Sequence, residues 1–182
     1  MIEVRWHGRG GQGAVTSVEL LAVSAIAAGK FAQGFPSFGP ERRGAPVAAF
    51  TRIDDKKIDV RSGIYEPDVV LVLDSSLIGL VNVTDGLKPD GKLIVNTHKT
   101  PEEIRKELNF NGTVATVDGT GIARTEMGVP IANTTMIGAL LKVTGVMELG
   151  AMKEAIENRF GRIAQKNLNA MKRAYDEIQI LN

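Results

Sequence analysis

Residues 1–29 of the chain read MIEVRWHGRGGQGAVTSVELLAVSAIAAG. Ile2, Val4 and Trp6 alternate with polar residues, which is the pattern of a half-buried strand. The residues from Ala14 onward are apolar at every third or fourth position, which is the pattern of a helix, and Gly29 ends this run. A strand, a glycine-rich loop and a helix in this order predict the first half of a βαβ unit.

The loop between this strand and this helix has the spacing G-x-G-x-x-G, with one additional glycine. Glycines let backbone N–H groups and the start of a helix approach an anion closely. His7 precedes the loop, and it either binds a phosphate or fixes the loop backbone. We therefore expect a loop that contacts an anionic ligand or another subunit, formed by His7, Gly8, Arg9, Gly10, Gly11, Gln12 and Gly13.

Two other interpretations of the loop stay open at this point. A nicotinamide-binding site needs an Asp or Glu at the end of the second strand, roughly 20 residues further on. Residues 30–35 contain no acid, and the next carboxylate after Glu19 is Glu41, in a segment rich in proline and glycine. Alternatively, the glycines serve only a tight turn and close packing of the helix on the strand.

The composition excludes several kinds of binding partner and of chemical site. The 182 residues include 22 basic and 21 acidic side chains, so no global charge favours nucleic acid or an anionic membrane. Cysteine is absent, which excludes disulfides, thiolate zinc sites, a cysteine nucleophile and cysteine-bound iron–sulfur clusters in this chain. The sequence has neither an apolar run long enough to span a bilayer nor a signal-peptide layout. We expect one cytoplasmic domain over residues 1–182.

Strand and helix patterns alternate along the rest of the chain. Strands are predicted at residues 47–53, 68–74, 92–96 and 113–117, with a hairpin that returns over residues 58–60. Residues 33–46 contain too many prolines and glycines for a regular element. Helices are predicted at residues 77–83, 100–109, 119–127, 133–143, 148–160 and 162–180, with Thr100 and Glu103 forming a capping box. The predicted fold class is α/β, with an open, mostly parallel Rossmann-like sheet, an antiparallel edge hairpin and a helical C-terminus.

Polar residues follow the ends of several predicted strands, where an open α/β sheet keeps its binding site. They are His7, Asp74 to Ser76, Asn96 to His98, and Asp118. Asp74, Ser75 and Asp118 alternatively serve only as helix caps. The residues offer no nucleophile–His–acid order, and two histidines without cysteine do not favour a metal site. We therefore assign no catalytic residue and no metal ligand to this chain.

A resemblance to a known family covers nearly the whole chain. Trp6 to Ala14 is similar to the N-terminal signature of the gamma subunit of 2-oxoacid:ferredoxin oxidoreductases. The similarity continues, in the family's order, through residues 38–46, 51–54, 67–70, 91–96 and 133–140, and through Phe160, Lys166, Asn167 and Ala170. The Arg-Trp-His-Gly opening resembles the pyruvate branch, and the branched-chain 2-oxoacid branch is closely related.

The resemblance implies a subunit of an enzyme that converts a 2-oxoacid and coenzyme A to acyl-CoA and CO2 while reducing ferredoxin. In such complexes thiamine diphosphate and Mg²⁺ lie on the alpha and beta subunits, and a delta subunit carries the iron–sulfur clusters. The gamma chain alone is then inactive. The resemblance implies that the anion loop and a second segment face other subunits or the coenzyme A path. That segment comprises Phe38, Gly39, Pro40, Glu41, Arg42, Arg43 and Gly44. Asn133 and Thr134 form a helix start that is typical of the family.

Two other functional hypotheses stay open beside that of a subunit of a catalytic complex. A stand-alone dehydrogenase would need the missing ribose-binding carboxylate. A scaffold subunit would bind its partner chains and no small ligand.

Overall fold

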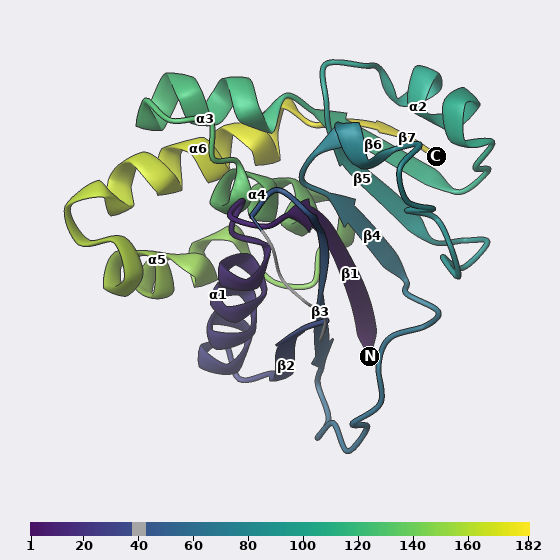
Figure 1. Cartoon of the computed structure of the whole chain (residues 1–182). Coiled ribbons are helices and arrows are strands. Elements are labelled where there is room, and N and C mark those ends of the chain that lie inside the picture. The colour runs from purple at the N-terminus through teal and green to yellow at the C-terminus, as the bar shows by residue number, and fades with distance from the viewer. Residues whose placement is uncertain (38–42) are drawn as a thin grey trace.

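The computed structural model describes residues 1–37 and 43–182. A seven-stranded sheet runs through the molecule in the order β2-β3-β1-β4-β5-β6-β7 (Figure 1). Strands β1, β4, β5 and β6 are parallel, whereas β3 lies antiparallel to β1 and β2, and β7 lies antiparallel to β6. The strands are β1 (Ile2–Arg9), β2 (Phe31–Pro36), β3 (Pro46–Asp54), β4 (Val69–Val72), β5 (Lys92–Asn96), β6 (Thr113–Val117) and β7 (Gln179–Leu181).

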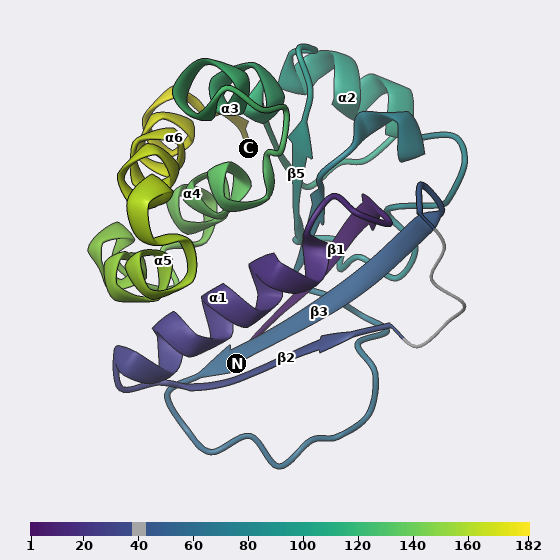
Figure 2. The same ribbon diagram turned by 60° about the vertical axis from the view of Figure 1, so that its left-hand side comes forward.

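The helices divide unequally between the two faces of the sheet. One face is covered by α1 (Ala14–Ala27), α3 (Gly119–Met127), α4 (Asn133–Thr144), α5 (Lys153–Phe160) and α6 (Ala164–Glu177), and α2 (Pro101–Leu108) lies on the other (Figures 1 and 2). Trp6, Leu71 and Ile94 point into the larger core beneath the five helices. Val70, Val95 and Ile104 belong to the smaller core beneath α2. Both faces of β4 are therefore buried, as its continuous apolar sequence predicts.

The structure confirms the predicted α/β class, the mostly parallel sheet, the antiparallel edge hairpin and the helical C-terminal region. It also confirms the start of α2 in detail. The Thr100 hydroxyl accepts a hydrogen bond from the Glu103 backbone N–H at 3.3 Å, and the Glu103 carboxylate accepts one from the Thr100 N–H at 2.7 Å. These two bonds satisfy groups at the helix start that have no partner within the helix.

The edge hairpin is formed by other residues than those predicted. Residues 33–36, expected to be irregular, belong to β2, which pairs with β3. A Cβ on Gly34 would lie 2.8 Å from the Val18 carbonyl oxygen of α1, so this glycine lets the strand pass close to the helix. The predicted return strand at 58–60 is wrong, because β1 and β2 already occupy both edges of β3.

Three predicted helices differ from the structure. The segment 77–83 contains only the end of a 3-10 turn, Ser75–Leu77, and Gly79 follows with a φ of 92°. The helix predicted at 148–160 begins as a 3-10 turn, Leu149–Met152, before α5. The last helix ends at Glu177, and the apolar residues that follow form β7 because the free edge of β6 gives them backbone partners.

Arg52 holds the long segment after β3 against the sheet. Its guanidinium is 1% exposed, bonds to Glu3 at 2.7 Å, and donates hydrogen bonds to the carbonyl oxygens of Ser62 and Gly63 at 2.7 and 3.1 Å. The segment curves below β2 and β3 in Figure 2. A buried arginine with these partners stabilises a connection that has no helix or strand of its own.

Candidate functional site

The glycine-rich loop joins β1 to α1 and uses two of its glycines for backbone shape. Gly11 has a φ of 93° and Gly13 a φ of 84°, values that favour glycine. Gly8 serves packing instead, because a Cβ there would lie 3.3 Å from a Leu73 methyl group. The Gln12 side chain closes the loop by accepting a hydrogen bond from the Arg9 N–H at 2.7 Å. These features are those expected if the glycines serve a tight turn and close packing, and contact of the loop with an anion or another subunit stays a prediction.

Asp74, at the end of β4, ties the loop to the neighbouring strand. Its carboxylate accepts a hydrogen bond from the Gln12 amide at 2.7 Å and lies 3.2 Å from the Arg9 guanidinium. Burial pushes the pKa of Asp74 upward, but hydrogen bonds from Ser76 and Gln12 and the Arg9 charge outweigh it and hold that pKa below its usual range. Arg9 also donates to the Ser76 hydroxyl at 2.9 Å and the Gly44 carbonyl at 3.0 Å.

The Asn96 side chain connects neighbouring strand ends where a shared crevice was predicted, and a small hollow there is lined by Gln12, Leu73 and Thr120 among others. Asn96 bonds to the Leu73 carbonyl and the Thr120 hydroxyl, both at 2.8 Å. Asp118 accepts from the Gly121 N–H at 2.8 Å and lies 3.3 Å from the exposed His98. Asp118 is thus a helix cap, the simpler of the two roles considered.

The His7 side chain does not add to the anion-binding surface expected of the glycine loop. Its side chain alternates with that of the buried Trp6 and so lies on the opposite face of β1. Burial, and then the Arg5 charge, lower the pKa of His7 to about 4. The imidazole is therefore neutral at pH 7 and brings no positive charge to the loop.

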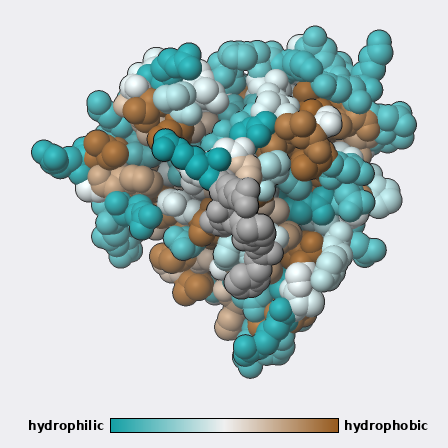
Figure 3. All heavy atoms as spheres, in the orientation of Figure 1, coloured by the Kyte–Doolittle hydropathy of each residue, from teal (hydrophilic) through white to brown (hydrophobic). Residues whose placement is uncertain are grey.

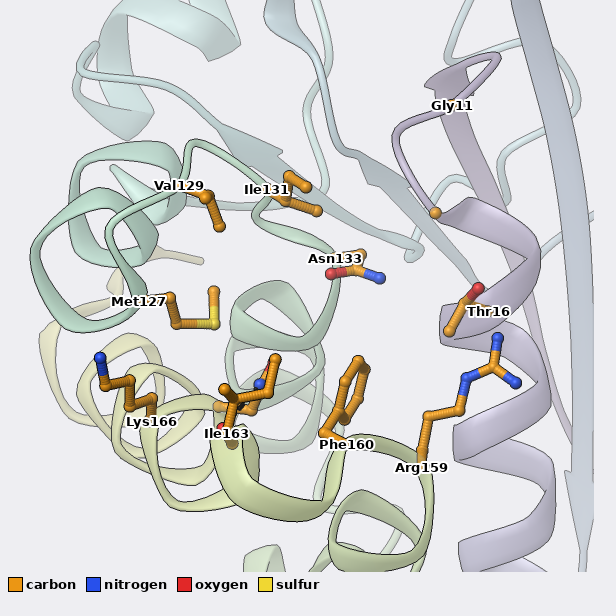
Figure 4. A pocket seen from close by; sticks show the side chains of 12 residues that line it. Gly11, Thr16, Met127, Val129, Ile131, Asn133, Arg159, Phe160, Ile163 and Lys166 are labelled. Carbon is orange, nitrogen blue, oxygen red and sulfur yellow. Dashed lines mark hydrogen bonds between the residues drawn. The ribbon is translucent and has the colours of Figure 1, made fainter.

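A cavity of about 390 Å³ opens beside the loop, at the point where the starts of α1 and α4 approach each other (Figure 4). Apolar side chains supply most of its wall, and Arg159 and Lys166 add two positive charges. None of its lining residues is acidic. The full lining is Gly11, Gly13, Thr16, Met127, Val129, Ile131, Asn133, Arg159, Phe160, Ile163, Lys166 and Asn167.

The helix start at Asn133 and Thr134 has a different form from the expected cap. The N-cap residue of α4 is Ala132, and no side chain among the described residues caps this helix. Thr134 is buried and donates to Asn167 at 2.7 Å. Asn133 is 9% exposed, and its amide points into the cavity (Figure 4). A Cβ on Gly13 would lie 2.5 Å from the Asn133 amide nitrogen, so this contact requires a glycine.

The fold brings together segments that are far apart in the sequence. The glycine loop, Asn133, Phe160 and Lys166 all line one cavity, although up to about 155 positions separate them along the chain. Sequence reasoning missed the apolar wall from Met127, Val129 and Ile131, and the charge of Arg159. The only sequence signal was the Gly128 and Pro130 break, which predicts an irregular connection but not where it lies.

Most of the expected contact segment 38–44 lies outside the described residues, namely Phe38, Gly39, Pro40, Glu41 and Arg42. The last two residues are described. Arg43 is exposed and forms an isolated bridge with Gly10, and the Gly44 N–H donates to the Gly10 carbonyl at 3.0 Å. The end of this segment therefore lies against the glycine loop.

The described residues contain no group of three or more His, Cys, Asp or Glu side chains that could hold a metal ion. In the same residues, no helix is long and apolar enough to cross a membrane.

The chain matches a family model described as pyruvate ferredoxin/flavodoxin oxidoreductase over residues 3–177. It is 53% identical to a Thermococcus kodakarensis protein named pyruvate/ketoisovalerate oxidoreductases common subunit gamma, over 97% of each chain. It is 51% identical to pyruvate synthase subunit PorC of Methanocaldococcus jannaschii, over 98% of this chain and 97% of that protein. The crystal structure of the pyruvate oxidoreductase subunit PORC from Thermotoga maritima superposes with a TM-score of 0.90 at 42% identity, covering 100% of this chain and 98% of that one.

Proposed function

Because the chain belongs to the pyruvate ferredoxin/flavodoxin oxidoreductase family, as a gamma subunit of a 2-oxoacid:ferredoxin oxidoreductase, we propose that it works within pyruvate synthase. The complex would convert pyruvate, coenzyme A and oxidised ferredoxin to acetyl-CoA, CO2 and reduced ferredoxin. The observation that carries this proposal is similarity to PorC proteins over nearly the full length of both chains.

The residues of this chain suit a subunit that leaves the redox chemistry to its partners. Its 182 residues include no cysteine to ligate an iron–sulfur cluster. Its described residues also offer no cluster of carboxylates and histidines for a metal. In line with what the family resemblance implies, we propose that thiamine diphosphate and Mg²⁺ lie on the alpha and beta subunits and that a delta subunit carries the iron–sulfur clusters and passes electrons to ferredoxin.

The glycine loop would contact the anionic part of coenzyme A from a hollow of about 290 Å³ lined by residues 9–11, 13–16 and Val47. The first N–H groups of α1 have no partner within the helix, and the helix dipole favours negative charge there. The Arg9 guanidinium already bonds to Asp74, Ser76 and Gly44. Backbone N–H groups, rather than Arg9, would therefore hold the phosphates.

Reconstitution of the complex tests the proposed function. Purified alpha, beta and delta subunits are assayed for pyruvate- and coenzyme A-dependent reduction of a viologen dye, with and without this chain. We expect turnover only when all subunits are present, and none from this chain alone. Turnover by the isolated chain, or an unchanged rate when it is omitted, would contradict the proposal.

A second substrate class is favoured by one observation. The Thermococcus kodakarensis relative is named as a subunit common to pyruvate and ketoisovalerate oxidoreductases. The same chain would then also complete a complex that oxidises 2-oxoisovalerate. The viologen assay tests this when the alpha and beta subunits are replaced by those of the branched-chain enzyme. The measured quantity is 2-oxoisovalerate-dependent dye reduction with and without this chain.

A stand-alone dehydrogenase has less support. The parallel neighbour of β1 is β4, and the carboxylate that follows it, Asp74, is already bonded to Gln12 and Arg9 of the loop and so is not free to bind a ribose. We expect no binding when NADH or NADPH is titrated into the isolated chain, as followed by nucleotide fluorescence.

A further inference from the structure

The cavity continues into a second hollow between α1 and α5. This hollow has a volume of about 290 Å³ and is lined by Thr16, Glu19, Leu20 and Val23 of α1 and by Ala155, Asn158 and Arg159 of α5. Thr16 and Arg159 line both spaces. We call the two together the α1–α5 groove. Its α1 wall from Thr16 to Val23 extends about 10 Å, the rise of seven helical residues.

Large apolar side chains along this groove are exposed. Val129 is 43% exposed, Ile131 45%, Ile163 53% and Val23 57%. Figure 3 shows hydrophobic surface in several places on the side of the molecule where α1 and α5 lie. Single exposed apolar residues are common, but several that line one depression are typical of a surface that binds another molecule.

The polar groups of the cavity select for negative charge. Arg159 and Lys166 are both exposed and stand at its wall, and neither has a carboxylate within salt-bridge distance among the described residues. Asn133, 9% exposed, adds an amide that points into the cavity and makes no hydrogen bond within the described residues. A ligand in the cavity could therefore bond to this amide without breaking a hydrogen bond of the chain.

We propose that the α1–α5 groove binds a segment of a partner subunit that carries a large apolar side chain next to a carboxylate. The apolar side chain would contact Phe160 and Ile131 in the cavity, and the carboxylate would bind Arg159 or Lys166. Arginine suits this role because its planar guanidinium binds a carboxylate through two parallel hydrogen bonds. The inference rests on the proposed function, because it requires a complex.

The length and the charge of the groove favour a chain segment over a phosphate-bearing small molecule. Glu19 lines the end that lies between α1 and α5, and its negative charge disfavours a multiply charged ligand extending there. A short peptide segment places one carboxylate near Arg159 and continues past Glu19 with neutral or basic residues. The hollow assigned to coenzyme A shares Gly11, Gly13 and Thr16 with the cavity, but its other lining residues are Arg9, Gly10, Ala14, Val15 and Val47, and neither Arg159 nor Lys166 lines it.

Charge and polarity changes in the groove test the inference. Two variants of the full chain, Ile163→Asp and the double variant Arg159→Glu with Lys166→Glu, are compared in binding to the partner subunits. We expect the dissociation constant of each variant to be at least tenfold larger than that of the parent chain. The matched controls are Leu80→Asp, at a site 63% exposed, and the double variant Lys56→Glu with Lys106→Glu; both should stay within twofold of the parent. Groove variants that bind as well as their controls would overturn the inference.

Hydrogen exchange on the unmodified chain gives a result that does not depend on variant folding. Backbone amides of residues 127–133 and 159–167 should exchange at least tenfold more slowly in the complex than in the isolated chain. Protection of these amides by coenzyme A alone would overturn the inference and assign the groove to a small ligand.

The two proposals fail in different ways. A parent chain that does not associate with the subunits contradicts the proposed function, and the inference with it. A parent chain that assembles and restores activity while these amides stay unprotected contradicts the inference alone.

Discussion

The starts of four helices fall into two groups, whereas α5 and α6 continue directly from the 3-10 turns Leu149–Met152 and Gly161–Ile163. At α2 and α3 the Thr100 hydroxyl and the Asp118 carboxylate accept hydrogen bonds from the first turn of their own helices. At α1 and α4 the described residues provide no such side-chain cap, and Gly13 and Ala132 stand in the cap positions. We call these the capped starts and the open starts.

The open starts border the same cavity, whereas the capped starts do not line it. A capped start is complete within the chain, because its N–H groups already have partners. An open start keeps N–H groups that a ligand, another subunit or water must satisfy. The starts of α2 and α3 are thus completed within the chain, whereas the starts of α1 and α4 border the cavity beside the glycine loop.

The largest effect is expected from a side chain at the contact between the two open starts. Gly13→Val forces a β-branched residue to a φ of 84° and places its Cβ 2.5 Å from Asn133. We expect about 3 kcal/mol or more of lost stability, from the left-handed backbone together with the clash. Urea unfolding of the isolated chain measures this loss.

Gly11→Val is the matched control for this prediction. Gly11 also has a positive φ, of 93°, but a Cβ there meets no atom within 4 Å. The backbone strain alone should then cost about 1–2 kcal/mol. Equal losses for the two variants would show that the Gly13–Asn133 contact contributes nothing to stability.

The second prediction concerns the strand that leads to the open start of α1. The pKa of His7 is about 4 in the folded chain, against 6.5 for an unperturbed histidine. As the pH falls from about 6.5 to 4, the unfolded chain takes up a proton that the folded chain does not, so stability decreases. Between pH 7 and 4.5 this contribution is about 2–3 kcal/mol.

Unfolding of the parent and of His7→Gln at both pH values isolates this contribution, since the carboxylates titrate in both proteins. The variant should lose less stability on acidification by roughly that amount. His98→Gln, at a side chain 84% exposed, is the surface control. Parallel pH profiles for parent and His7→Gln would show that the imidazole is not buried in its neutral form.

The smallest effects should separate the two groups of helix starts. Thr100→Ala removes the cap of α2 and should cost about 1 kcal/mol of stability while leaving the activity of the reconstituted complex unchanged. Asn133 makes no hydrogen bond among the described residues, so Asn133→Ala should cost less stability than Thr100→Ala does. The complex with Asn133→Ala should nevertheless be weaker or less active. Urea unfolding and the viologen assay on the same two variants test both statements. The distinction between capped and open starts would be wrong if Thr100→Ala lowered the activity of the complex and Asn133→Ala lowered only stability.

The sequence by itself determined the elements whose cause is local. The period of apolar residues placed β1, α1, β4, β5 and β6, and the Thr100-Pro101-Glu102-Glu103 sequence placed the start of α2, because a capping box needs only four consecutive residues. A resemblance along nearly the whole chain indicated the family, and that resemblance accounts for the absence of cysteine in this chain.

Only the tertiary structure decided the features that depend on a distant partner. Gly34 and Pro36 read as breakers, yet they lie in β2 because α1 packs against it and β3 offers an edge. Gln179 and Ile180 were predicted to end a helix, yet they belong to β7 and pair with β6. The cavity is of the same kind, since it exists only where the chain folds back to bring Asn133 and Phe160 to the glycine loop. A local sequence pattern indicates the backbone preference of a few residues. A strand pairing or a cavity wall depends instead on which distant segment of the chain packs beside those residues.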